Sequence, residues 1–68
     1  MKVVALLPAF NEAESIVQTL TAALELKCID QIVVIDDGSQ DDTFALASSF
    51  AKDQRIMVLR LPKNRGKG

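Results

Sequence analysis

The sequence contains no histidine and a single cysteine, Cys28, among its 68 residues. Imidazole base catalysis and histidine-ligated metal sites are therefore excluded, and one cysteine cannot form an internal disulfide. Long apolar runs are also absent. The longest covers residues 3–10, well below the ~20 residues of a membrane-spanning helix, and the N-terminus lacks the features of a signal peptide. These absences favour a reducing compartment and a chain that does not itself span a membrane.

Composition and charge point to a small globular unit with an anionic ligand. Apolar residues make up 49% of the chain and charged residues 25%, as in globular proteins, and the length permits at most one small domain with a marginal core. Residues 1–54 carry three lysines against nine carboxylates, a balance of −6. The remaining segment is purely basic, which indicates an anionic ligand or, alternatively, a solvated tail. Its basic residues are Arg55, Arg60, Lys63, Arg65 and Lys67.

Three short apolar runs alternate with two amphipathic patterns, which predicts the order β-α-β-α-β. The runs cover residues 3–7, 32–35 and 56–61, and the first two are continuously apolar, as in strands buried on both faces of a parallel sheet. Asn11 followed by Glu14 forms a capping-box pattern that predicts the start of the first helix. The second helix is expected to start within residues 39–42. The expected core-facing helix residues are Ala13, Ile16, Val17, Leu20, Ala23, Leu24, Leu46, Ala47 and Phe50.

Right-handed crossovers in one direction place both helices on the same face of the sheet. Because the strands are apolar on both sides, we expect the other face to be covered by more chain or by another subunit. Residues 64–68 are typical of a loop that enters a further element. We therefore expect residues 1–68 to be the N-terminal part of a single larger α/β domain.

In a parallel sheet the loops that follow the strands meet at one edge, where ligands bind. These loops are residues 8–12, residues 36–39 with two further aspartates behind them, and residues 62–68. Together they offer an aromatic ring, paired carboxylates and a glycine-flanked basic loop, which suit the base, ribose and phosphates of a nucleoside diphosphate. Taken singly, each has a structural explanation: Phe10 as a helix staple, the aspartates as turn and cap residues, and the basic loop as solvated surface.

Three segments resemble the N-terminal motifs of the family 2 glycosyltransferases of GT-A fold, in the branch of the dolichyl-phosphate mannose and glucose synthases. They read VVALLPAFNEAESI, IVVIDDGSQDDT and LPKNRGKG. The resemblance implies a parallel, three-layer, Rossmann-like α/β fold, with this chain as the N-terminal half of a nucleotide-sugar-binding domain. It also implies transfer of a sugar, with inversion, from a UDP- or GDP-linked donor.

The resemblance further implies Mg²⁺ or Mn²⁺ as cofactor, with the metal ligands and the catalytic base beyond residue 68. The chain alone would then bind donor nucleotide without catalysing transfer. The acceptor implied is a polyprenyl or dolichyl phosphate, or else a glycan, and no nucleic-acid partner is expected. The implied location is the cytoplasm, at the cytoplasmic face of a membrane for a lipid acceptor.

By position, the resemblance assigns seven nucleotide-binding residues: Pro8, Phe10, Glu12, Asp36, Asp37, Arg65 and Lys67. The first three would line the nucleobase pocket, with Phe10 where the family usually has tyrosine, so that stacking is kept and a hydroxyl is lost. Asp37 would accept a hydrogen bond from the base, and Asp36 would orient the loop or touch the ribose. Arg65 and Lys67 would lie near the diphosphate.

Three other classes of protein remain as alternatives. A dinucleotide-binding Rossmann domain also has an acidic residue after its second strand, but the first turn here, PAFNEAES, lacks the required glycines. An aspartate-based phosphatase or phosphoacceptor uses a strand-end carboxylate as nucleophile, but Asp36 and Asp37 are adjacent and not spaced by one residue. The third alternative is a non-catalytic nucleotide-binding or scaffold fragment.

Overall fold

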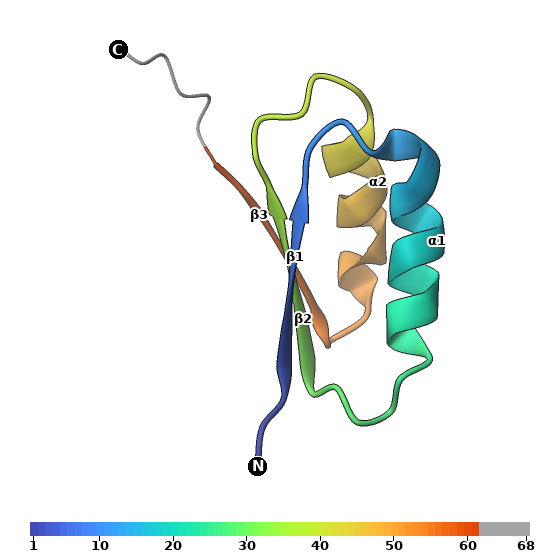
Figure 1. Ribbon diagram of the computed structural model, residues 1–68, viewed down its shortest axis with the longest axis vertical. Helices are drawn as coiled ribbons and strands as arrows, with labels where there is room; N and C mark the ends of the chain where they lie inside the picture. The colour runs from blue at the N-terminus through green and yellow to red at the C-terminus, as the bar shows by residue number, and fades with distance from the viewer. Residues whose placement is uncertain (62–68) are drawn as a thin grey trace.

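The computed structural model describes residues 1–61, and these residues form the predicted β-α-β-α-β unit (Figure 1). The basic loop with Arg65 and Lys67 lies outside the described residues. None of the helices in the described part is long and apolar enough to cross a bilayer. The elements are β1 (Val4–Ala9), α1 (Ala13–Leu24), β2 (Gln31–Asp36), α2 (Thr43–Ser49), the 3₁₀ turn η1 (Phe50–Lys52) and β3 (Ile56–Arg60).

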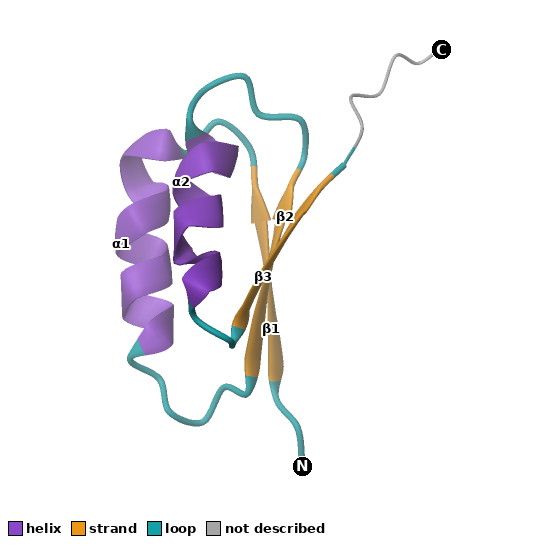
Figure 2. Ribbon diagram, turned by 180° about the vertical axis from the view of Figure 1, so that it is seen from behind, coloured by secondary structure: helices purple, strands orange, loops and turns teal. Residues whose placement is uncertain are grey.

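The three strands form one parallel sheet in the order β1-β2-β3. Both helices lie on the same side of this sheet, as the front and back views show (Figures 1 and 2). The predicted α/β fold class, the parallel pairing and the shared helix face are thus confirmed. The described residues form two of the three layers predicted for a complete domain, one of strands and one of helices.

The core lies between the sheet and the two helices, and the alternation of β2 shows how it is built. Ile32 and Val34 are fully buried and face the helices, and Asp36 continues the same side of the strand. Two residues of α1, Ile16 and Leu20, pack against them. Of the other predicted core positions, Val17 is 40% exposed, because it lies at the flank of the apolar stripe.

The opposite face of the sheet is apolar and exposed in the described part of the chain. Its most exposed side chain is Leu6 at 63%, and Val4, Met57 and Leu59 are each 45–46% exposed. The register pairs Leu6 with Val33 and Val33 with Met57, so these side chains form one continuous apolar surface. That another segment or subunit covers this surface stays a prediction.

The capping-box prediction at the first helix is wrong. α1 begins at Ala13, after an N-cap residue, Glu12, that makes no side-chain capping bond. Asn11 instead adopts a left-handed conformation with φ 51°, which asparagine tolerates better than most residues. Its side-chain carbonyl accepts a hydrogen bond from the backbone N–H of Gln40 at 2.8 Å, so Asn11 connects two loops and does not cap its own helix.

The basic segment does not act as one ligand-binding unit, because Arg55 has a structural role. It lies before the first residue of β3, at the end of the sheet away from the predicted ligand edge. Its guanidinium donates hydrogen bonds to the carbonyls of Leu26 and Ile29, at 3.1 Å each, and to that of Leu24. These carbonyls belong to the last turn of α1 and the loop after it, so this charge stabilises a helix end.

Candidate functional site

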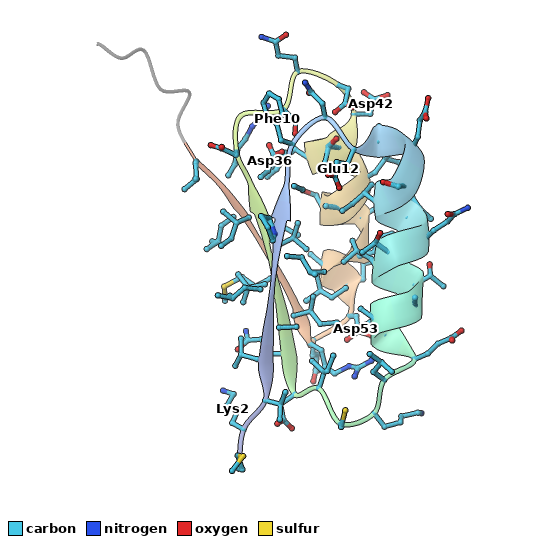
Figure 3. The ribbon with its side chains drawn as sticks, viewed as in Figure 1. Lys2, Phe10, Glu12, Asp36, Asp42 and Asp53 are labelled. Carbon is cyan, nitrogen blue, oxygen red and sulfur yellow. The ribbon has the colours of Figure 1, made fainter. Side chains whose placement is uncertain are left out.

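The carboxyl ends of the strands bring the first two predicted loops together at one edge. The backbone N–H of Asp37 donates to the carbonyl of Ala9 at 2.9 Å, and that of Leu61 donates to the carbonyl of Asp36 at 2.9 Å. Figure 3 shows Phe10, Glu12 and Asp36 at this end of the molecule, far from Lys2. The predicted convergence is confirmed for these two loops, and the third loop lies outside the described residues.

Side chains from the β2–α2 loop connect this edge internally. The Ser39 hydroxyl accepts a hydrogen bond from the backbone N–H of Asn11 at 2.8 Å, and the Thr43 hydroxyl accepts one from the N–H of Glu12 at 2.7 Å. Both donors belong to the turn between β1 and α1, which would otherwise leave these groups unpaired. Ser39 and Thr43, which are themselves buried, therefore fix the backbone around Phe10 and Glu12.

Asp41 caps both helices at once. One carboxylate oxygen accepts from the Thr43 N–H at 2.9 Å and from the Thr43 hydroxyl, and the other accepts from the N–H of Ala13 at 3.2 Å. The first of these helix ends is that of α2 and the second that of α1. The hydrogen bond from the Thr43 hydroxyl, followed by backbone donors, holds the pKa of the Asp41 carboxyl below its usual value. Asp41 thus has a structural role at this edge.

Asp36 is fully buried, and both of its carboxylate oxygens face other side chains of the protein. One of its oxygens accepts a hydrogen bond from the Ser39 hydroxyl, and the other lies 3.4 Å from the Nε atom of Arg60. Arg60 also donates from Nη2 to the Ser39 carbonyl at 3.0 Å, and its guanidinium carbon lies 4.7 Å from the centre of the Phe44 ring. Of the two functions that the resemblance left open for Asp36, this geometry favours orientation of the loop.

The remaining predicted residues of the edge are exposed. Asp37 and Glu12 are exposed, Phe10 is 54% exposed and so does not serve as a buried helix staple, and Pro8 lies on the open face of the sheet. Among residues 1–61, no side chain donates a hydrogen bond to the Asp37 carboxylate. The two adjacent aspartates therefore have different environments: Asp36 is buried in the framework, whereas Asp37 is exposed and its carboxylate accepts no side-chain hydrogen bond within residues 1–61.

Ser39, Thr43 and Arg60 were not predicted as parts of the site. Arg60 lies opposite Asp36 in the parallel register of β2 and β3, and this register comes from the structure, so no local sequence pattern identified the pair. Within residues 1–61 no group of three or more acidic or thiol side chains is placed to hold a metal ion.

A parallel α/β unit with an acidic, aromatic edge at the carboxyl ends of its strands is typical of nucleotide-binding enzymes. Residues 4–68 match the family model described as Glycosyl transferase family 2, and the chain belongs to that family. This finding confirms the resemblance drawn from the three motifs. No solved structure matches the chain.

Individual relatives share the same region. The chain is 41% identical over 66 residues to the uncharacterized protein MJ0544 of Methanocaldococcus jannaschii, covering 94% of this chain and 28% of that protein. It is 36% identical over 75 residues to a dolichyl-phosphate beta-glucosyltransferase of Dictyostelium discoideum, covering 93% and 23%. A poly-beta-1,6-N-acetyl-D-glucosamine synthase of Staphylococcus epidermidis is 36% identical over 63 residues, covering 91% and 15%. The chain spans less than a third of the length of these relatives.

Proposed function

We propose that this chain supplies the nucleotide-binding half of a glycosyltransferase domain that transfers a sugar, with inversion, from a UDP- or GDP-linked donor. The observation that carries the proposal is the contrast at the sheet edge between a fixed backbone and free side chains. Asp37 and Phe10 are exposed, whereas the backbone N–H groups of Asp37 and Asn11 are hydrogen-bonded across the two loops. Such preorganisation lowers the entropic cost of ligand binding.

Each exposed residue has a function in this proposal. The Phe10 ring offers a flat surface on which a nucleobase stacks, and the Asp37 carboxylate accepts a hydrogen bond from a base N–H. Glu12, at the start of α1, and Pro8, at the end of β1, form the walls of the nucleobase pocket. Asp36 holds the loop and does not itself contact the base.

The phosphates and the metal ion involve residues outside the described part. We assign Arg65 and Lys67 to the diphosphate of the donor, because guanidinium and ammonium groups next to glycines suit phosphate oxygens. Mg²⁺ or Mn²⁺ would neutralise the charge of the diphosphate leaving group, held by ligands beyond residue 68. The catalytic base would likewise lie there.

For the acceptor we propose a polyprenyl phosphate, used at the cytoplasmic face of a membrane. Two relatives carry the name dolichyl-phosphate beta-glucosyltransferase, one from Dictyostelium discoideum and one from Trichomonas vaginalis. A glycan acceptor is the second candidate, because several relatives are named as poly-beta-1,6-N-acetyl-D-glucosamine synthases. Transfer assays with a polyprenyl phosphate and with an oligosaccharide distinguish the two.

The proposal is tested by calorimetric titration of the full-length protein with UDP, GDP and the corresponding nucleosides. Replacing Arg65 and Lys67 together by alanine should weaken binding of the preferred diphosphate by at least about tenfold, since two charge-assisted contacts are lost. Nucleoside affinity should stay the same. The matched control replaces Lys2 and Lys52, which are both exposed and precede β1 and β3, at the end of the sheet away from the ligand edge, and it should alter neither affinity.

Two outcomes contradict the proposal in different ways. An unchanged ratio of diphosphate to nucleoside affinity in the double variant would show that the basic loop does not contact the phosphates. Absence of binding of either nucleotide to the wild-type protein would contradict the proposed function itself and favour the scaffold alternative. Raised salt should also reduce the preference for diphosphate, because exposed charges are screened over about 8–10 Å at physiological ionic strength.

A further inference from the structure

Arg60 joins three pieces of the sheet edge, and the proposed function gives it no part. From the end of β3 its side chain reaches buried Asp36 on β2, the carbonyl of Ser39 in the β2–α2 loop and the ring of Phe44 on α2. We call Asp36 and Arg60 the clamp. The Oδ2 atom of Asp36 has no hydrogen-bond partner within residues 1–61, so Arg60 is the group that compensates its charge.

The clamp is connected to the residues that are proposed to bind the nucleobase. Asp36 accepts a hydrogen bond from the Ser39 hydroxyl, and the same hydroxyl accepts one from the backbone N–H of Asn11, which directly follows Phe10. Asp36 also directly precedes Asp37 in the chain. Two hydrogen bonds therefore lead from the Asp36 carboxylate to the residue next to Phe10, and one peptide bond leads to Asp37.

We infer that Arg60 is a positioning residue for nucleotide binding: through Asp36 and Ser39 it sets the relative placement of Phe10 and Asp37. This inference rests on the proposed function, because it concerns the same edge. It makes Asp36 an internal acceptor that acts through the clamp and not a ligand of the ribose. It also makes the end of β3, where the basic loop begins, part of the nucleobase site.

Direct binding of phosphate by Arg60 is the competing explanation, since half of its side chain is exposed. The contacts of the guanidinium argue against it. Its Nε faces Asp36, its Nη2 donates to the Ser39 carbonyl, and it lies over the Phe44 ring. These contacts occupy the Nε–Nη2 edge of the guanidinium, which is one of the two edges with paired donors that arginine uses to bind a phosphate.

The test compares R60M with R55M in the full-length protein. Both variants remove an arginine of the β3 region that donates to backbone carbonyls, but Arg55 does so at the opposite end of the sheet. We expect R60M to weaken UDP or GDP and the matching nucleoside by the same factor, about two- to thirtyfold, the range found for coupling through hydrogen-bonded networks. R55M should lower the melting temperature and leave both affinities unchanged.

A second measurement does not depend on any nucleotide. Amide hydrogen exchange should be faster in R60M at Asn11 and Gln40, whose N–H groups form the hydrogen bonds between the loops. The amide of Asp30, which donates to the Val3 carbonyl at the other end of the sheet, should exchange as in the wild type. If R60M does not fold, R60K serves in its place, because lysine keeps the charge beside Asp36 but has no planar fork to reach Ser39 as well.

The outcomes separate the inference from the proposed function. Unchanged exchange at Asn11 and Gln40, or a loss of affinity for the diphosphate but not for the nucleoside, would overturn the positioning role of Arg60. If the wild type binds no nucleotide, the proposed function fails, whereas the exchange measurement still decides whether the clamp orders the loops.

Discussion

Replacing Asp37 by asparagine is the sharpest single test of the nucleobase site. The change keeps the size of the side chain, removes its charge and replaces one acceptor oxygen by an NH₂ donor. The backbone N–H of Asp37 remains bonded to the Ala9 carbonyl, and no side chain among residues 1–61 donates to the carboxylate that is lost. We therefore expect the variant to fold with unaltered stability, so that any loss of affinity reports on the ligand contact alone.

The magnitude follows from the kind of hydrogen bond that is lost. A hydrogen bond to an ionised acceptor contributes about 1.5–3 kcal/mol, which corresponds to an increase in Kd of about 10- to 150-fold. The contact concerns the base, so D37N should weaken binding of nucleoside and diphosphate alike. This behaviour distinguishes Asp37 from Arg65 and Lys67, whose removal should affect only the diphosphate.

The assay is calorimetric titration of D37N beside a control, D42N. Asp42 is also exposed and lies in the same loop, and its side chain makes no capping bond, so D42N should keep wild-type affinity. Asp41 is unsuitable as the control because its carboxylate caps both helices. Equal affinities of D37N and D42N, with both variants folded, would refute the assignment of Asp37 to the base.

Two further predictions concern the framework that holds the site. R55M should lower the free energy of unfolding by about 2–3 kcal/mol, since three hydrogen bonds to carbonyls at the end of α1 are lost. As the control, K52M replaces an exposed side chain and should lower it by less than about 0.5 kcal/mol. Denaturant midpoints at an unchanged slope measure both changes. D41N should be less stable than the wild type at neutral pH. The folded-state pKa of Asp41 lies below its ordinary 3.8. The ionised Asp41 carboxylate therefore stabilises the fold above pH 3.8, and this stabilisation is lost as the pH falls through the folded-state pKa. The difference in stability between the wild type and D41N should accordingly shrink in acid. A difference that is the same at pH 7 and in strong acid would contradict this explanation.

The order and pairing of the elements could be predicted from the sequence because they depend on local patterns. Runs rich in valine and isoleucine indicated the strands, and the handedness of crossovers placed both helices on one face. The ends of the strands could not be predicted from these apolar runs. β1 extends to Ala9, past Pro8, and β2 includes Asp36, because pairing with a neighbour prolongs a strand beyond the valine-, isoleucine- and leucine-rich run that indicated it.

The site was predictable in outline and not in its connections. The strand alternation that buries Ile32 and Val34 also buries Asp36 and leaves Asp37 exposed, so the different environments of the two aspartates could have been deduced. The function of Asn11 could not, because its partner Gln40 is 29 residues away and the contact exists only once the sheet has formed. The Asn11 side chain therefore forms a long-range hydrogen bond to Gln40 in place of the predicted local capping bond.

Pro8 has a consequence for what can lie beside β1, which is an edge strand in the described part of the chain. The carbonyls of Val3 and Ala9 point toward β2, and since backbone groups alternate along a strand, the ring nitrogen of Pro8 points to the free side. Any strand added there finds no donor at Pro8, so its ladder must weaken just before the ligand edge. The same missing donor makes this apolar edge a poorer template for uncontrolled strand addition and aggregation.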